Sequence, residues 1–111
     1  MSLRNKVTLI GRTGKEVEIT TFENGQKASV SLATTDFYKN AQGEKVEDTQ
    51  WHNLVAFGKL ADILKLANKG QEIAIEGKLV NRSYEDKEGV TRYISEIRVE
   101  EILLLGSKTT D

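Results

Sequence analysis

The sequence predicts one small all-β domain with a single helix, built either as a barrel or as a sandwich. Short apolar runs recur along the 111-residue chain, and turn residues separate them. Only residues 60–67 carry apolar side chains at helical spacing. A hydrophobic fraction of 38% with 30% charged residues is typical of a soluble globular protein, and the length suits one core but not two.

Strands are expected wherever apolar and polar residues alternate. They are residues 6–10, 17–22, 27–34, 51–57, 73–84 and 91–99, with a final apolar piece at 102–105. The loops and hairpin tips between the strands fall at residues 11–15, 23–26, 39–48 and 85–89. Gly11 and Gly14 end the first strand, and Asn24-Gly25 is a strong signal for a hairpin between the second and third strands.

One amphipathic helix is expected after the strand at 51–57. Leu60, Ile63, Leu64 and Ala67 lie at positions i, i+3, i+4 and i+7, which places them on one helical face. Gly70 lies where a left-handed residue would end the helix. This order of elements occurs in five-stranded Greek-key barrels, but the pattern alone predicts only a small barrel or sandwich.

The strand at 51–57 is unusual because both of its faces carry apolar side chains. One face carries Trp51, Asn53, Val55 and Phe57, and the other carries His52, Leu54 and Ala56. Leu54 and Ala56 suit a core, whereas two large rings about 20 Å apart on the other face form a platform for flat ligands such as nucleobases. The alternative interpretation is that both faces are buried in a dimer or a sandwich.

No constellation of catalytic residues is present. The chain has no Cys, which excludes disulfides, thiolate metal sites and a cysteine nucleophile. Its single histidine, His52, lies beside Leu54 and is expected in the core or at a subunit contact. The segment 11–15 superficially resembles a phosphate loop but lacks the spacing and the following helix. We expect a protein that is not an enzyme and that needs no cofactor or metal.

The overall charge argues mildly against nucleic acid as a partner. Sixteen basic and 17 acidic residues give a net charge of −1, whereas nucleic-acid-binding domains are usually basic. A basic face could still exist, because several acids gather in two apparent loops: Glu44, Glu47, Asp48, Glu85, Asp86 and Glu88. No apolar run approaches the roughly 20 residues of a membrane span, and we expect a cytoplasmic protein without membrane contact.

Several stretches, in this order and spacing, together carry a family resemblance. They are Asn5-Lys6-Val7 with Leu9-Ile10-Gly11, Ser31-Leu32-Ala33-Thr34, Thr49-Gln50-Trp51-His52 with Val55-Ala56-Phe57-Gly58-Lys59-Leu60-Ala61, Lys69-Gly70 with Ile75-Glu76-Gly77-Lys78-Leu79, then Tyr84 and Arg92-Tyr93. The chain resembles the bacterial single-stranded DNA-binding proteins from about Asn5 to Leu105.

This resemblance implies a fold and a function. The expected fold is a five-stranded Greek-key OB-fold barrel over residues 1–105, followed by a short polar end at 106–111. The expected function is sequence-nonspecific binding and protection of single-stranded DNA in replication, recombination and repair. The resemblance also implies a nucleoid-associated homotetramer, with Lys6, Val7 and His52 near subunit contacts.

The resemblance also assigns roles to individual residues. A core position is the default expectation for each of the three Phe, three Tyr and one Trp. The family's base-stacking rings nevertheless fall on Trp51, on Phe57, on Tyr84 (where Trp is usual) and on either Phe37 or Tyr38. Candidates for phosphate contacts are Arg4, Lys6, Lys59, Lys69, Lys78, Arg82 and Arg92, and Asn53 lies on the face of Trp51. Arg82 is favoured because its i, i+2 spacing places it on the face of Tyr84.

The C-terminal sequence departs from the family pattern. Members usually continue with a flexible linker and an acidic tip that recruits replication and repair proteins, whereas residues 106–111 contain neither, which puts tail-mediated recruitment in doubt. A trimmed protein and a short accessory paralogue, such as one on a mobile element, both remain open. So do two other functions, a dimeric primosomal OB-fold protein and an OB-fold protein-interaction subunit. The near-neutral charge favours the interaction subunit, and the rings oppose it.

Overall fold

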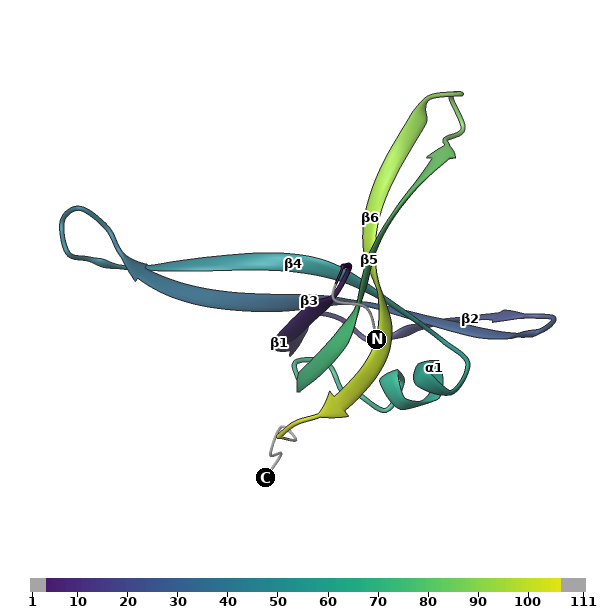
Figure 1. The fold of residues 1–111 in the computed structure, drawn as a ribbon, viewed down its shortest axis with the longest axis horizontal. Coiled ribbons are helices and arrows are strands. Elements are labelled where there is room, and N and C mark those ends of the chain that lie inside the picture. The colour runs from purple at the N-terminus through teal and green to yellow at the C-terminus, as the bar shows by residue number, and fades with distance from the viewer. Residues whose placement is uncertain (1–3, 107–111) are drawn as a thin grey trace.

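The computed structural model describes residues 4–106. These residues form β1 (Val7–Thr13), β2 (Glu18–Phe22), β3 (Gly25–Lys39), β4 (Lys45–Phe57), α1 (Lys59–Leu64), β5 (Glu72–Glu85) and β6 (Thr91–Leu104) (Figure 1). The expected order, with one helix before the last two strands, is confirmed.

Hydrogen bonds between strands close five of them into a barrel. Neighbouring strands follow the order β1-β5-β6-β4-β3, and β1 also pairs with β3, with Arg12 opposite Ala33 and Thr13 opposite Leu32. The pairing of β4 with β6 is parallel, and the other pairings are antiparallel. β2 pairs with β3 at the outer edge of the sheet. This is the predicted OB-fold barrel with one additional edge strand.

The core of the barrel is aliphatic. Its buried cluster consists of Ala28, Val30, Leu32, Leu54, Ala56, Ala61, Leu64, Ala67, Ile73, Ile75, Ile97 and Val99. Alternate residues of β3 supply the first three, as the strand period requires, and α1 adds Ala61 and Leu64. Each buried Leu or Ile contributes about 1.5–3 kcal/mol. This cluster contains no aromatic ring.

The prediction that Gly11 ends the first strand is wrong. β1 continues to Thr13, and a Cβ atom at Gly11 would lie 2.3 Å from the carbonyl oxygen of Ala33. A residue without a side chain is required here because β1 and β3 approach closely where the barrel closes. Gly77 has the same role beside β6, where a Cβ atom would lie 2.2 Å from the carbonyl oxygen of Arg98.

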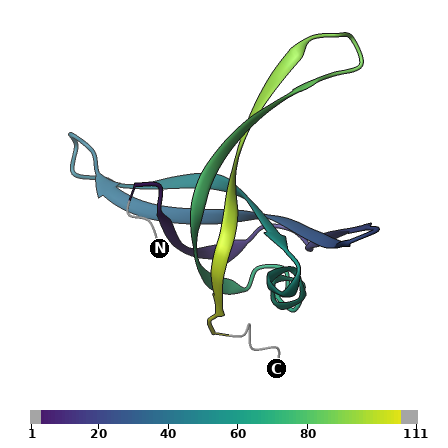
Figure 2. The same ribbon diagram turned by 45° about the vertical axis from the view of Figure 1, so that its right-hand side comes forward.

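Hairpins extend beyond the barrel in three directions (Figures 1 and 2). β3 and β4 stay paired as far as Lys39 opposite Lys45, so the loop predicted at 39–48 is reduced to residues 40–44. Several pairs of this arm are polar on both strands, such as Thr35 opposite Thr49 and Asp36 opposite Asp48, so this part of the arm shows no apolar alternation in the sequence. The β5–β6 hairpin extends away from the side on which α1 lies (Figure 2). The third hairpin joins β2 to β3 and turns at residues 23–24, one position before the expected pair Asn24-Gly25.

Two further boundaries differ from the prediction. The helix ends at Leu64, and although Gly70 has the expected positive φ of 78°, it lies in a later turn rather than at the helix end. The apolar piece expected at 102–105 is mostly the continuation of β6, which passes an irregularity in its pairing with β5 between Glu76 and Gly77. Of the predicted polar end at 106–111, only Gly106 lies within the described residues.

Candidate nucleic-acid interface

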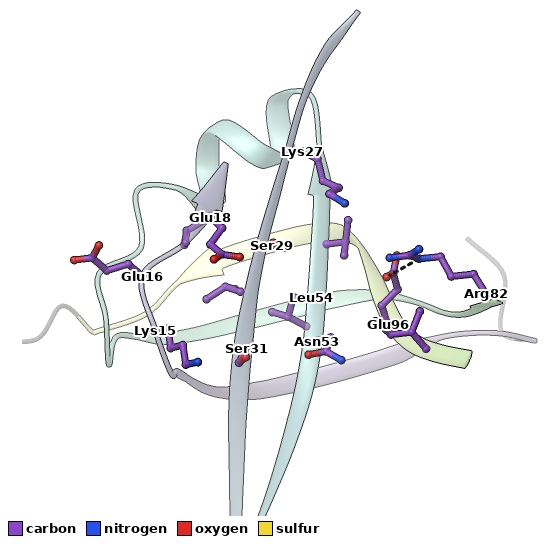
Figure 3. A pocket seen from close by; sticks show the side chains of 14 residues that line it. Lys15, Glu16, Glu18, Lys27, Ser29, Ser31, Asn53, Leu54, Arg82 and Glu96 are labelled. Atoms are coloured by element: carbon purple, nitrogen blue, oxygen red, sulfur yellow. Dashed lines mark hydrogen bonds and ion pairs between the residues drawn. The ribbon is translucent and has the colours of Figure 1, made fainter. Parts of the chain in front are cut away.

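A groove of about 590 Å³ crosses β3 and β4 on the outside of the barrel. Its floor includes Ser29, Ser31, Asn53 and Val55. One wall is formed by residues 15–18, which lead into β2, and the other by Arg82, Ile94 and Glu96 of the β5–β6 hairpin (Figure 3). Figure 3 shows Lys15 and Glu18 on one side of the two strands and Arg82 with Glu96 on the other.

The groove lies on what we call the outer face, defined by the odd-numbered residues of β3 and β4. Cross-strand partners share a face, and the relevant pairs are Ala33 with Trp51, Ser31 with Asn53, Ser29 with Val55 and Lys27 with Phe57. Trp51 and Phe57 therefore flank the groove floor along β4, and they are 62% and 40% exposed. Leu54 and Ala56 are fully buried on the opposite face, as the alternation predicts.

The indole ring of Trp51 rests against Gly14. A Cβ atom at Gly14 would lie 2.4 Å from Cζ3 and 2.9 Å from Cη2 of the ring, far inside van der Waals contact. The missing side chain thus creates the space in which the benzo part of the indole lies. Gly14 therefore supports Trp51 while most of the ring surface stays accessible.

Cations lie beside the rings at both ends of the outer face. The guanidinium of Arg98 is 5.1 Å from the centroid of the Phe57 ring, and Lys45 Nζ is 4.3 Å from that of Phe37. Both distances are in the range of a cation–π contact. Each cation covers one face of its ring, so a base would stack on the other face or displace the cation, which could then approach a phosphate.

The pairing of β3 with β4 distinguishes Phe37 from Tyr38, the two rings between which the sequence did not decide the stacking position. Phe37 lies opposite Glu47 on the outer face, which also carries Trp51, whereas Tyr38 lies opposite Val46 on the face of His52. Both rings are more than half exposed. Phe37 is therefore the ring that continues the platform of Trp51 along the β3–β4 arm.

Tyr84 lies on the face of the β5–β6 hairpin that forms the groove wall. It is opposite Arg92, and its neighbour on this face, Arg82, is opposite Ile94. Arg82 and Ile94 both line the groove, so Tyr84 continues this wall toward the hairpin tip. Its side chain is 49% exposed.

Three of the predicted cations are held by carboxylates. Arg82 Nε donates to Oε1 of the buried Glu96 at 3.1 Å, and Lys6 Nζ is 3.1 Å from Oε2 of Glu76. Arg92 Nε donates to Asp86 Oδ2 at 2.9 Å. This hydrogen bond, together with those from the backbone amides of Val90 and Glu88, holds the pKa of Asp86 below its usual value of 3.8.

The other predicted cations do not line the groove. Arg4 and Lys6 precede or border β1, Lys59 begins α1 directly after Phe57, and Lys69 lies in the turn before β5. Lys78 lies opposite Arg98 on the outer side of the β5–β6 pair. The cations that do line the groove beside Arg82 are Lys15 and Lys27, neither of which was predicted.

None of the rings lies in the core: the exposure expected at Trp51, Phe57, Tyr84 and the Phe37–Tyr38 pair is confirmed, and the default core position is wrong for Phe22 and Tyr93. Each of the three Phe, three Tyr and one Trp is at least 40% exposed, including Phe22 at 48% and Tyr93 at 81%. The signal that could have identified Phe22 is its position two residues before Asn24-Gly25, at the tip of a hairpin that leaves the barrel. No residue pattern along one β-strand identifies Gly14 as part of the site, because its contact with Trp51 depends on closure of the barrel.

The remaining chemistry of residues 4–106 is limited. The Nε2 atom of His52 is 2.9 Å from the hydroxyl of Thr34, which gives this partly buried ring a polar partner. The described part of the chain contains no group of three His, Cys, Asp or Glu that could hold a metal ion. None of its helices has the length and apolar character needed to cross a bilayer.

Known proteins resemble this chain over nearly its whole length. The model of the single-strand binding protein family matches residues 4–105. The chain is 42% identical to single-stranded DNA-binding protein 1 of Xylella fastidiosa over 97% of this chain and 82% of that protein. It is 44% identical to the single-stranded DNA-binding protein of Bacteroides thetaiotaomicron over 94% of this chain and 67% of that protein.

Solved structures share the fold. The Plasmodium falciparum SSB in its complex with ssDNA superposes with a TM-score of 0.82 at 29% identity, covering 96% of this chain and 97% of that one. A deletion mutant of the single-stranded DNA binding protein from Thermus aquaticus gives a TM-score of 0.80 at 25% identity, covering 94% of this chain and 51% of that one. From the matching family model and these relatives, the chain belongs to the single-strand binding protein family.

Proposed function

We propose that this chain is a non-catalytic protein that binds single-stranded DNA without sequence preference and protects it during replication, recombination and repair in the cytoplasm, at the nucleoid. The observation that carries this proposal is the placement of Trp51 and Phe57 at the two ends of a groove floor, exposed, above a core without rings. Family membership supports the same function.

Base stacking and phosphate contacts both contribute to the proposed binding. A base stacked on an aromatic ring contributes about 1–3 kcal/mol, and every base has a flat face, so the platform accepts any sequence. Phe37 and Tyr84 extend the platform of Trp51 and Phe57 on two hairpins. Duplex DNA binds weakly because its bases are already stacked on one another.

The phosphate contacts are assigned to cations on or beside the groove. Arg82 Nε is engaged by Glu96, which leaves the terminal nitrogens of its guanidinium for a phosphate. Lys15 and Lys27 line the same groove, and Arg98 lies over Phe57. Acidic neighbours reduce the net positive field, so stacking should supply a large share of the affinity.

An oligothymidine titration at low and high salt tests this function. Trp51 is the only tryptophan, so its emission reports on the platform, and we expect strong, saturable quenching. Affinity should fall with salt by a slope of about −0.7 per phosphate contact. Duplex DNA of the same length serves as the control. Equal affinity for duplex and single strand, or no quenching, would refute the function and favour an OB-fold protein-interaction subunit.

The protein is further proposed to act as a homotetramer. Ile10, Ala74 and Leu103 lie side by side across β1, β5 and β6, and Ile10 and Leu103 are 58% and 62% exposed. Beside them, Glu76 Oε1 is buried without a hydrogen-bond partner, while Oε2 contacts Lys6. An exposed apolar row next to an unsatisfied carboxylate oxygen suits contact with a second copy.

The residues expected at subunit contacts from the sequence lie in two places. At the start of β1, Lys6 borders this apolar row, and the partly buried side chain of Val7 packs against the core cluster. His52 lies on β4 against Thr34. Sedimentation should give four times the chain mass of 12.4 kDa, and Leu103→Glu should lower that mass. Leu66→Glu, at a 65% exposed position after α1, is the matched control, and a monomeric unsubstituted protein would contradict this assembly.

A further inference from the structure

Phe22 is an exposed ring that is not part of the proposed stacking platform. It lies at the end of β2, opposite Gly25, where the β2–β3 hairpin turns. Its side chain is 48% exposed, and it is absent from the buried core cluster. A large ring at a hairpin tip adds nothing to the core, which raises the question of what contacts it.

The outer face continues from β4 across β3 onto β2. Phe57 lies opposite Lys27, and Lys27 lies opposite Thr20 on its other side. Phe22 follows Thr20 by two residues and therefore points to the same face as Phe57. With strands about 4.8 Å apart and a rise of about 3.4 Å per residue, the Cα atoms of Phe22 and Phe57 are about 12 Å apart.

Cations lie along this path. Lys27 is between the two rings on β3 and also lines the groove, and Arg98 is over Phe57. One acid, Glu18, shares the face opposite Ser29 and lines the groove wall. The other two rings outside the platform, Tyr38 and Tyr93, do not extend it, because each lies on the opposite face of its strand pair.

We propose that the DNA path leaves the groove over Phe57 and continues onto the β2–β3 hairpin, where Phe22 stacks on a further base and Lys27 contacts its phosphate. This inference rests on the proposed function and extends its site by one ring and one cation. The ligand is the same single-stranded DNA, and the consequence is a longer footprint on each subunit. Strands too short to reach the β2–β3 hairpin bind to the platform without using Phe22.

The test measures affinity as a function of strand length. Labelled oligothymidines from about 4 to 16 nucleotides cover the site sizes of one OB-fold. Phe22→Leu keeps an apolar side chain but removes the ring, so it should weaken binding of the long oligomers about five- to hundredfold, the range of one base–ring stack. Short oligomers should bind within twofold of the unsubstituted protein. Phe22→Tyr should restore the long-strand affinity.

Tyr93→Leu is the matched control, because Tyr93 is the most exposed ring but lies on the other face. It should leave the affinity unchanged at every length. A second measurement places the reporter at the site itself. With Phe22→Trp in a Trp51→Phe background, long oligothymidines should quench the emission and short ones should not.

Several results would overturn the inference. The first is an unchanged affinity of Phe22→Leu for long strands, and the second is an equal loss of affinity at all lengths. The others are a sedimentation mass of Phe22→Leu that differs from that of the unsubstituted protein, and an emission of the Phe22→Trp reporter that long strands do not quench. Should Phe22→Leu fail to fold, the Phe22→Trp reporter alone decides. If the unsubstituted protein binds no oligothymidine, the proposed function itself fails. Normal binding with insensitive Phe22 variants refutes only the extended path.

Discussion

Replacing Gly14 by alanine places a Cβ atom where the Trp51 ring now lies. The new atom would be 2.4 Å from Cζ3, whereas carbon atoms in contact lie about 3.5–4.0 Å apart. The ring must therefore move by more than about 1 Å. Gly14 does not have a positive φ, so alanine can adopt its backbone conformation without strain. The perturbation acts on the position of the indole and leaves the main chain unchanged.

The expected loss follows from the cost of returning the ring to its place. Holding a side chain about 30° from a rotamer costs about 0.5–1.5 kcal/mol, and 1.4 kcal/mol is a tenfold change in affinity. Gly14→Ala should therefore weaken oligothymidine binding about 2- to 12-fold. This is less than the loss of a complete stack, about 1–3 kcal/mol. Folding stability should not fall through the backbone, because removing a glycine lowers the entropy of the unfolded chain.

Anisotropy of labelled oligothymidine gives the affinities for a double-mutant cycle. In a Trp51→Ala background, Gly14→Ala should have no further effect beyond about 0.5 kcal/mol. Gly106→Ala is the control, since a Cβ atom there meets open space. The reasoning is refuted if Gly14→Ala binds normally, or if it weakens binding equally with and without Trp51.

Three other outcomes are expected. Trp51→Ala and Phe57→Ala should each weaken binding by about 1–3 kcal/mol while the protein stays folded; unfolding at a cost of about 3–5 kcal/mol would show that the ring is core. The affinity should fall less steeply with salt concentration than it does for a strongly basic protein. A slope as steep as that expected if phosphate contacts supplied all of the affinity would contradict this. The pKa of Asp86 is lowered by Arg92, so the stability from this carboxylate is present above its usual value of 3.8 and is lost as pH falls through the lower folded value. Protection of the Val90 amide from hydrogen exchange should fall in that window, and Asp86→Asn should remove the dependence.

The barrel was predictable because its core is periodic in the sequence. Leu54 and Ala56 alternate with residues of the opposite face, and the helical spacing around Leu64 appears once. The hairpin arms were not predictable to the same degree. Pairs such as Thr35 with Thr49 are held by cross-strand contacts at solvent-exposed positions, and such pairs leave no apolar alternation in either strand.

The candidate site divides in the same way. Counting along one strand placed Trp51 on the face opposite Leu54 and Ala56, which needs no tertiary information. Its 62% exposure required the structure, because the same pattern also allowed burial of both faces in a dimer or a sandwich. The choice of Phe37 over Tyr38 as the stacking ring required the pairing of β3 with β4. The pairing shows that β3 continues past residue 34 and that Phe37, opposite Glu47, shares the face of Trp51. The support of Trp51 by Gly14 required the closed barrel. Contacts between distant segments have no local signature.

The separation of an aliphatic interior from an aromatic surface has a practical consequence for spectroscopy. Trp51 is already 62% in contact with solvent in the native state, so denaturation changes its surroundings only slightly. Intrinsic emission should therefore be a poor indicator of thermal melting, and a scan that relies on it would understate the transition. Circular dichroism of the strands reports on the fold, which leaves the indole signal free to follow the ligand.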